Sequence, residues 1–243
     1  MSRQAEIVDY LAEVGFASVD ALATRFGVTP STIRRDLADL ERSQLVQRTH
    51  GGALAMHNIE TPFEFKEALH SSEKQAIGAA MADRILDGQT VLLDSGSTTL
   101  EVARHLHAER LTVVTNDLRI GLEVAERQSG HLVFIGGELL PNVYTMWGPA
   151  SIAQLQTLRV NVAVFGADAV LDDGIYNTTS YELEIKRLMH SIAGESFFVA
   201  DSSKFQRDAL FRVFGFDSCV AGFSDASLSP ILAAKFPVPI IRV

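Results

Sequence analysis

The sequence predicts an α/β protein in which a small, helix-rich N-terminal module precedes a larger domain built on a mostly parallel sheet. Helical apolar spacing fills most of the first 42 residues, and a hairpin-like alternation follows at 45–54. Beyond that point, short β-branched runs alternate with amphipathic helical patterns, as in sheets covered on both faces. We expect three segments: the module at 1–56, a linker at 57–72 and the larger domain at 73–243.

Two supporting helices are expected in the first 27 residues. The first runs from Gln4 to Val14 with apolar residues at helical spacing. The second follows Ser18, whose hydroxyl can accept a hydrogen bond from a free backbone N–H group. It ends at Gly27, because glycine adopts the left-handed conformation without steric cost. A helix, a glycine turn and a further helix at this separation are typical of helix-turn-helix modules.

The third helix has the chemistry of a helix that enters the major groove of DNA. Thr29 is a suitable N-cap, and Pro30 suits the first helical position. Ile33, Leu37 and Leu40 form one apolar stripe. Arginine can bridge a guanine edge or neutralise a phosphate, and a small residue permits close approach. The helical residues predicted to contact DNA are Thr29, Ser31, Thr32, Arg34, Arg35 and Arg42, with Ala38 on the same outward side.

A basic β-hairpin is expected after this helix, over residues 45–54, with Gly51-Gly52 as its turn. Its predicted DNA contacts are Arg48, His50 and Gly51. The module is therefore interpreted as a winged helix. The alternative is a small helical bundle with ordinary surface arginines, and the capped helix and the wing together argue against it.

Charge and cysteine content bound the possible functions. The net charge is −9, but residues 1–56 carry six arginines against seven acidic residues, about −1. Charge alone therefore does not indicate a nucleic-acid partner. Cys219 is the only cysteine, which excludes an intrachain disulfide and fits a reducing cytoplasm. With no signal peptide and no apolar run near the ~20 residues of a membrane span, we expect a cytoplasmic protein, nucleoid-associated and without a membrane partner.

The larger domain is expected to alternate helices and strands. The predicted strands are 90–93, 111–114, 131–135, 160–165 and 196–200, and the predicted helices include 73–87, 98–107 and 117–127. Small and polar residues follow each strand: Asp94 to Thr99, Thr115-Asn116-Asp117, Gly136-Gly137-Glu138, Gly166-Ala167-Asp168 and Asp201 to Lys204. In parallel sheets, ligands bind beyond the carboxyl ends of the strands.

The loop before helix 98–107 is the candidate phosphate site. The free N–H groups and positive end of this helix lie beside Ser95, Gly96, Ser97 and Thr98, whose hydroxyls would add donors. Lys204 could supply a point positive charge. Each piece alone also has an ordinary explanation. The loop could be only a capped turn, Lys204 a surface lysine, and Glu182 with Lys186 a surface ion pair at i, i+4.

Several motifs resemble those of DeoR-type bacterial transcriptional regulators. In the module these are Ser31-Thr32-Ile33-Arg34-Arg35-Asp36-Leu37, Leu40-Glu41 and Arg48-Thr49-His50-Gly51-Gly52-Ala53. The family's Glu-x-x-Gly-Leu reads Glu41-Arg42-Ser43-Gln44-Leu45 here, so one glycine is missing. In the larger domain the matching stretches are the strand-end motifs above, with Glu182 and Lys186.

The resemblance implies a fold related to ribose-5-phosphate isomerase, glucosamine-6-phosphate deaminase and coenzyme A transferases. It also implies a sensor of phosphorylated sugars or related metabolites. The residues implied at the phosphate are Asp94, Ser95, Gly96, Ser97, Thr98 and Thr99. Asn116, Gly136 and Gly137 belong to the same set of strand-end loops, and the residues implied near the sugar end are Asp168, Glu182, Lys186 and Lys204.

Two functional classes compete. The first is a repressor of carbohydrate or polyol catabolism genes, which binds double-stranded operator DNA and responds to a phosphorylated sugar or polyol. The second is a sugar-phosphate isomerase or deaminase with an attached DNA-binding module. The enzymes of this fold carry an acidic residue just after the Gly-Ala-Asp stretch, where this chain has Ala169-Val170. We therefore expect a regulator and no enzyme, with no cofactor and no metal, and Glu182 remains the conceivable base of the enzyme alternative.

A third alternative is a regulator whose second domain is empty and structural. We also expect a homodimer or homotetramer, because one small winged helix reads few base pairs and paired half-sites solve this by symmetry.

Overall fold

The structure is a computed structural model that describes residues 3–43, 45–49, 51–55, 63–127, 130–140 and 143–243. Contacts within the chain divide it into two compact units, residues 1–69 and 70–243. Gln44 and His50 lie outside the described residues.

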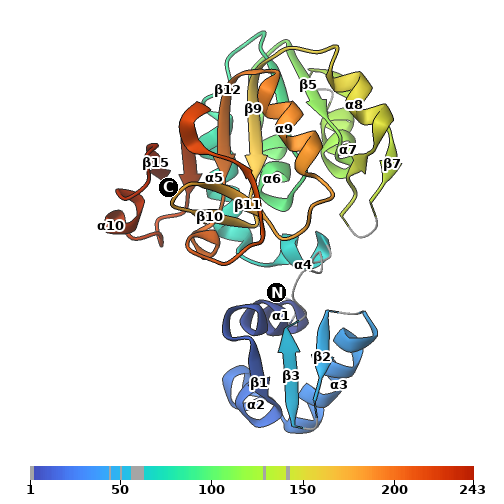
Figure 1. Ribbon diagram of the computed structural model, residues 1–243, viewed down its shortest axis with the longest axis vertical. Coiled ribbons are helices and arrows are strands. Elements are labelled where there is room, and N and C mark those ends of the chain that lie inside the picture. Colours follow the sequence, from blue (N-terminus) through green and yellow to red (C-terminus); the bar gives the residue numbers. More distant parts are fainter. Residues whose placement is uncertain (1–2, 44, 50, 56–62, 128–129, 141–142) are drawn as a thin grey trace. The chain divides into compact units, whose positions relative to one another are not determined.

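The N-terminal unit has a winged helix-turn-helix fold (Figure 1). Its apolar core includes Leu11, Leu22, Ile33, Leu37 and Leu40. This arrangement confirms the fold expected for the module. The elements in order are α1 (Arg3–Val14), β1 (Phe16–Ser18), α2 (Val19–Phe26), α3 (Pro30–Arg42), β2 (Val46–Arg48), β3 (Gly52–Ala55) and α4 (Phe63–Ala68).

The predicted helix caps are present. The Ser18 hydroxyl accepts from the Ala21 N–H group at 3.1 Å, and Gly27 has a left-handed φ of 63°. The Thr29 hydroxyl accepts from the Thr32 N–H group at 3.3 Å. These local bonds fix where α2 ends and where α3 begins, as the sequence indicated.

The wing differs from the prediction at Gly52. This residue is the first of β3 and pairs with Ser18 of β1, in a sheet of order β1-β3-β2. A Cβ atom on Gly52 would lie 2.2 Å from the carbonyl oxygen of Ala17. Gly52 therefore permits the close approach of β1, a strand that the sequence did not predict, and does not act as a turn residue.

The segment expected as a linker is helical in its second half. Residues 57–62 lie outside the described residues, and α4 occupies the next six positions. Phe63 is buried, and Phe65 packs against the core of the N-terminal unit. Phe65 therefore packs α4 on that unit's core.

The C-terminal unit is built on a seven-stranded sheet of order β15-β14-β12-β9-β4-β5-β6, in which every pairing is parallel. Its elements are α5 (Ser71–Ala82), β4 (Thr90–Leu93), α6 (Ser97–His105), β5 (Leu111–Thr115), α7 (Leu118–Arg127), β6 (Gly130–Phe134), β7 (Glu138–Leu139), β8 (Met146–Trp147), α8 (Pro149–Leu155), β9 (Val160–Gly166), β10 (Ala169–Leu171), β11 (Gly174–Asn177), α9 (Leu183–Ser191), β12 (Ala193–Val199), β13 (Phe211–Phe214), β14 (Cys219–Ser224), α10 (Pro230–Ala233) and β15 (Ile240–Arg242), with 3-10 turns at Ser202–Lys204 and Phe216–Ser218.

The expected α/β class with a mostly parallel sheet is confirmed, and all five predicted strands lie in this sheet. The sequence did not predict β14 and β15, which extend the sheet, or two small antiparallel sheets, β10-β11-β13 and β7-β8. The predicted helix 73–87 ends earlier, at Ala82, because the following residues turn toward Gly88, whose φ is 76°.

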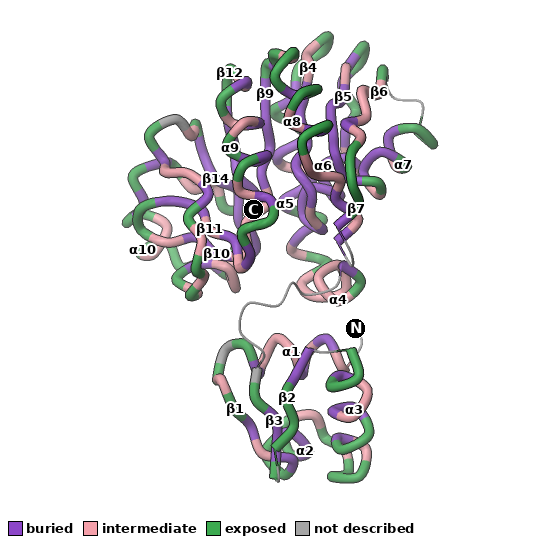
Figure 2. The backbone as a smooth tube through the Cα atoms, turned by 45° about the vertical axis from the view of Figure 1, so that its right-hand side comes forward, coloured by how far each residue is buried: buried purple, intermediate pink, exposed green. Residues whose placement is uncertain are grey.

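Helices cover the main sheet on both faces, with α8 and α9 in front of it and α5 and α6 behind it in Figure 1. The central strands are buried along most of their length, as Figure 2 shows. Phe165 and Phe198 contribute the largest side chains of this core. In the described part of the chain, no helix is long and apolar enough to cross a membrane.

Candidate functional site

The outward face of α3 carries the predicted DNA-contacting side chains. Ser31, Arg34, Arg35 and Arg42 are exposed, and the opposite side of the helix is buried. Asp36 also lies on the buried side, where its carboxylate accepts from the Arg3 guanidinium at 2.6 Å. This ion pair ties α1 to α3 and so fixes the orientation of the outward face.

The basic side chains of this surface differ in what they already bind. Arg42 pairs with Asp39 on its own helix, and Arg48 of the wing lies 3.5 Å from the carboxylate of Glu41. Within the described residues, Arg34 and Arg35 take part in no ion pair. Since both point into solvent, they can contact DNA without first breaking a bond within the protein.

The remaining predicted contacts of the N-terminal unit have mixed placement. Thr29 and Gly51 are exposed and Thr32 is half-buried. The Thr29 hydroxyl is already bonded to the hydroxyls of Ser31 and Thr32 as well as capping α3. The predicted contact by His50 falls outside the described residues.

In the C-terminal unit, the strand order reverses between the neighbouring strands β4 and β9. The chain proceeds from β4 to β5 and β6 on one side, and from β9 to β12 and β14 on the other. In sheets of this kind, ligands bind where the strand order reverses, outside the carboxyl ends of the strands. The loops that begin at Asp94 and Gly166 flank this point, as the sequence predicted.

A buried ion pair lies at the carboxyl ends of β4 and β9. The ammonium group of Lys186, on α9, lies 2.7 Å from Asp94 Oδ2 and donates to the Gly166 carbonyl oxygen at 3.3 Å. The Gly166 N–H group donates to the same Asp94 oxygen at 3.1 Å. Both charged side chains are at least 95% buried. Lys186 is therefore an internal cation, and the surface ion pair that its spacing from Glu182 suggested is not its role.

Three carboxylates surround this cation. Burial alone would lower the pKa of Lys186, but the negative charges of Asp94, Glu182 and Asp168 raise it above the ordinary value of 10.5. Lys186 is therefore protonated at neutral pH. The structure thus brings four of the predicted residues into one electrostatic cluster.

Glu182 and Asp168 form hydrogen bonds with residues at and just after the end of β11. Asp168 Oδ2 accepts from the Thr178 N–H group at 3.0 Å, and the Asp168 N–H group donates to the Tyr176 carbonyl oxygen. Asn177 Nδ2 donates to Glu182 Oε2 at 3.4 Å. The sequence analysis missed Asn177, because β11 was not recognised as a strand and no periodic signal marks it.

Ser95 takes part in a buried hydroxyl network. Its Oγ donates to Asp117 Oδ2 at 2.7 Å, and Thr145 Oγ1 donates to Ser95 Oγ at 2.6 Å. Burial raises the pKa of Asp117, against the opposing effect of the Ser95 hydrogen bond. In this structure the Ser95 proton is therefore committed to Asp117. The sequence analysis did not include Asp117 or Thr145 among the site residues.

No side chain caps the backbone N–H groups in the first turn of α6. Its N-cap, Gly96, has a φ of 146° and supplies no side-chain cap. The Thr99 hydroxyl donates back to the Gly96 carbonyl oxygen at 2.9 Å. Ser97 and Thr98 flank backbone N–H groups that have no partner within the helix, as at every helix start. These groups and the helix dipole together favour an anion such as phosphate.

Asn116, Gly136 and Gly137 make structural contacts. Asn116 Nδ2 donates to the Met146 carbonyl oxygen at 2.8 Å, which joins the end of β5 to β8. Gly136 bonds with Gln154 and Ser151 of α8. A Cβ on Gly137 would lie 2.2 Å from the Ser151 hydroxyl. The glycines thus allow α8 to pack closely against this loop.

Lys204 lies in a second cluster, beyond β12. Asp201 caps its 3-10 turn by accepting from the Ser203 N–H group at 3.1 Å. Burial would raise the pKa of Asp201, but the charge of Lys204, the Ser203 hydrogen bond and the charges of Lys74 and His70 lower it. Lys204 is therefore placed beside Asp201, two strands away from β4.

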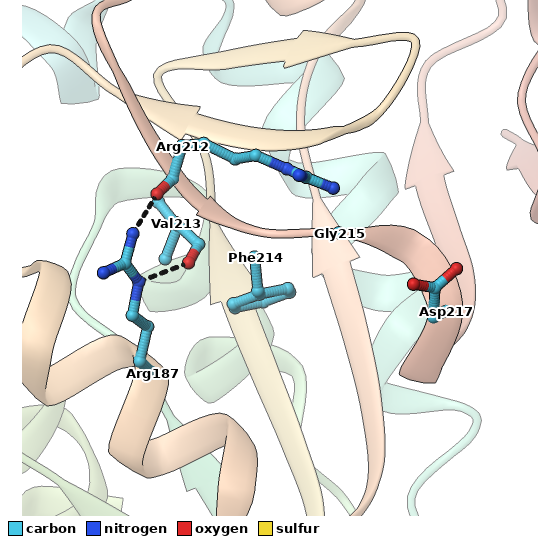
Figure 3. Close-up of a pocket in the computed structure, with 6 residues that line it drawn as sticks. All are labelled: Arg187, Arg212, Val213, Phe214, Gly215 and Asp217. Carbon is cyan, nitrogen blue, oxygen red and sulfur yellow. Dashed lines mark hydrogen bonds between the residues drawn. The ribbon is translucent and has the colours of Figure 1, made fainter.

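A cavity of about 250 Å³ lies elsewhere, between α9 and β13 (Figure 3). Arg187 donates from Nε to the Val213 carbonyl oxygen at 2.8 Å and from Nη2 to the Arg212 carbonyl oxygen at 2.6 Å. Arg212 in turn donates to the Asp173 carbonyl oxygen. These bonds join α9 to the sheet β10-β11-β13. The arginines that line the cavity therefore already have structural hydrogen-bond partners.

Two family models match the sequence of this chain. Residues 3–58 match the model of the DeoR-like helix-turn-helix domain, and residues 69–226 match that of the DeoR C-terminal sensor domain. The chain belongs to the DeoR family of transcriptional regulators. Both halves of the expected resemblance are thereby confirmed.

Two relatives in this family are named as repressors. The chain is 32% identical over 213 residues to the transcriptional repressor AccR of Agrobacterium fabrum, covering 86% of this chain and 83% of the relative. It is 30% identical over 223 residues to the glycerol-3-phosphate regulon repressor of Escherichia coli K12, covering 90% and 88%. These DeoR-family relatives are regulators by name, not enzymes.

Among solved structures, the chain is similar to ribose 5-phosphate isomerase A from Methanocaldococcus jannaschii. The TM-score is 0.42 at 16% identity, over 56% of this chain and 55% of that one. The fold class of this DeoR-family chain rests on its observed strand order and not on this overlap.

Proposed function

We propose that this protein represses genes for the use of a sugar or polyol, and that a phosphorylated metabolite controls its binding to operator DNA. The metabolite would bind beyond the carboxyl ends of β4 and β9, where the strand order reverses, with its phosphate on the first turn of α6. Its hydroxyl-bearing end would lie toward the cluster around Lys186. Ligand control requires that the two DNA-binding states differ in ligand affinity.

The observation that carries this proposal is the meeting of two features at one strand switch. The N-terminus of α6 has no side-chain cap, and beside it Asp94 and Lys186 form a buried ion pair. An anion-binding helix end next to buried polar groups suits a ligand with a phosphate at one end and hydroxyls along its length.

The enzyme alternative lacks comparable support. An isomerase or deaminase needs a base within reach of a carbon-bound proton. Positions 169 and 170 hold Ala and Val, both buried in β10. Glu182 is hydrogen-bonded to Asn177 beside Lys186, an arrangement that orders the carboxylate within a charge cluster. We therefore propose a regulator without catalytic activity, acting as a homodimer or homotetramer that presents paired winged helices to DNA.

Thermal unfolding against matched ligands tests the effector half of the proposal. The purified full chain is heated with phosphorylated and unphosphorylated members of the same sugar or polyol. The unfolding midpoint should rise with one phosphorylated compound and not with its partner. Binding to the native state stabilises by about 2.7 kcal/mol at a hundred times the dissociation constant. A shift with an unphosphorylated polyol, or with no phosphorylated compound, would contradict the proposed phosphate site.

Arg35→Ala tests the DNA-binding half, on an operator obtained by selection from random DNA. If Arg35 bridges a guanine edge, the variant should lose discrimination at one base position, at a cost of about 1–3 kcal/mol. Fluorescence anisotropy with single-base operator variants measures this. Arg159→Ala removes the same charge from an exposed site in the C-terminal unit and should bind like wild type. Unchanged base discrimination in Arg35→Ala would remove this residue from base recognition.

A further inference from the structure

We propose that Asn177 is a specificity-determining residue, whose side-chain carbonyl oxygen accepts a hydrogen bond from a hydroxyl group of the effector. The effector would then be a phosphorylated polyol or sugar whose distal end carries hydroxyls, and a phosphorylated sugar acid would be rejected. This inference rests on the proposed function, because it assigns the second end of the same site.

The first observation is a buried polar atom with no bond. Asn177 is 2% exposed, and its Oδ1 has no hydrogen-bond partner among the described residues. The orientation of the amide is fixed by chemistry, since Nδ2 faces the Glu182 carboxylate. A flipped amide would place two acceptor oxygens against each other. Oδ1 is therefore a buried acceptor to which no described residue donates, and a ligand hydroxyl can supply the missing donor.

The second observation is where the backbone holds this residue. The neighbours of Asn177 on both sides are bonded to Asp168, through the Tyr176 carbonyl oxygen and the Thr178 N–H group. Asp168 is the second residue after the end of β9. Figure 1 shows β11 at the end of the main sheet toward which the arrowhead of β9 points. Asn177 thus lies at the carboxyl end of the sheet, beside two of the residues proposed to bind the effector, Glu182 and Asp168.

The third observation is the chemical character of the surroundings. The charge on Lys186 is shared among Asp94, Glu182 and Asp168, so the cluster has more acceptors than donors. Two bonds from the Lys186 ammonium group already go to Asp94 and to the Gly166 carbonyl oxygen. A ligand hydroxyl can donate to such a site. A ligand carboxylate would add a further negative charge and has no proton to donate at neutral pH.

Selectivity of this kind is strong, because a site built around a hydrogen bond rejects a ligand that leaves a buried group unpaired. The proposal therefore predicts two separate properties. Wild-type protein should prefer the hydroxyl-ended member of a pair of phosphorylated compounds, and Asn177 should be needed for that preference.

The test uses pairs that differ only at the end remote from the phosphate. Suitable pairs are glycerol 3-phosphate with 3-phosphoglycerate, ribitol 5-phosphate with 5-phosphoribonate, and glucitol 6-phosphate with 6-phosphogluconate. Dissociation constants are measured by calorimetry on the full chain. We expect the polyol phosphate of at least one pair to bind wild type at least tenfold more tightly than its acid.

Asn177→Leu keeps the branching and the number of heavy atoms of the side chain, and it removes the acceptor together with the donor to Glu182. It should weaken binding of the preferred polyol phosphate about 10- to 100-fold and leave the affinity for the acid nearly unchanged. Asn161→Leu is the matched control, since Asn161 lies at the opposite, amino end of β9, where its Oδ1 accepts from the Thr90 N–H group. If Asn177→Leu does not fold, Asn177→Ala is used, with the same expected loss.

The outcomes separate the two proposals. If inorganic phosphate and every phosphorylated compound fail to bind wild type, the phosphate site is wrong, and this inference fails with it. If phosphorylated compounds bind but acids bind as well as polyols, only the inference is overturned. The same holds if Asn177→Leu weakens both members of a pair equally, since the residue would then have a purely structural role.

Discussion

Lys186→Met should lower the free energy of unfolding of the C-terminal unit by about 3–5 kcal/mol, because it leaves Asp94 buried without its cation. Methionine fills a similar volume, so the loss reports charge and hydrogen bonding more than packing. Asp168 and Glu182 lose the same cation, which adds to the cost.

Urea unfolding followed by tryptophan fluorescence measures the free energy of unfolding of the C-terminal unit. Trp147 is the only tryptophan in the sequence and lies in β8 of the C-terminal unit. Lys235→Met, at an exposed lysine after α10, is the control and should change stability little. A loss below about 1 kcal/mol in Lys186→Met, a value typical of surface pairs, would mean that water reaches the ion pair.

The pH dependence of this difference has a defined sign. The pKa of Lys186 is raised above its ordinary value of 10.5, so the folded protein holds this proton more tightly than the unfolded chain. Its stabilising effect is fully present below the unfolded pKa and is lost as the pH rises through the folded pKa. In Lys186→Met, burial raises the pKa of Asp94 without the opposing charge of Lys186, so the folded variant holds a proton there that the unfolded chain does not. The gap in stability between wild type and Lys186→Met should therefore widen as the pH rises from the acidic range through neutral pH.

Local sequence signals predicted the parts of the molecule that local bonds determine. The N-cap Thr29 marks the start of α3, and the apolar stripe of the helix marks its buried side. Both features can be recognised within a few residues of sequence. The strand ends of β4 and β9 could also be located, because small polar residues follow buried β-branched runs. The sequence therefore indicated which loops lie at the carboxyl ends of these strands.

Contacts between distant residues could not be predicted in the same way. Three strands of the main sheet, β5, β6 and β9, lie between Asp94 and Lys186 in sequence, and Lys186 has Glu182 four residues away as an apparent partner. The role of Gly52 depends on the carbonyl oxygen of Ala17, in a strand of only three residues. Asn177 was missed for a similar reason, since its burial depends on Asp168 and Glu182 and not on its own neighbours in the chain.

Ser97→Asp should abolish the response to the phosphorylated effector while DNA binding is retained. Ser97 is the first residue of α6 and is 7% exposed, so a carboxylate there lies within the proposed phosphate position. At about 4 Å, two like charges near a protein surface repel by about 4 kcal/mol, which corresponds to a loss of affinity of more than 100-fold. The same carboxylate suits the positive end of the helix, so folding should be preserved.

The measurement is the affinity for operator DNA with and without the effector identified by thermal unfolding. Ser97→Asp should bind DNA with wild-type affinity at every effector concentration that alters wild-type binding. Ser97→Asn is the control of similar shape, and it should still respond because it adds no charge. A normal effector response in Ser97→Asp would place the phosphate away from α6, whereas loss of response in both variants would indicate a steric effect. A response lost only with the negative charge identifies the first turn of α6 as the point at which phosphate controls DNA binding.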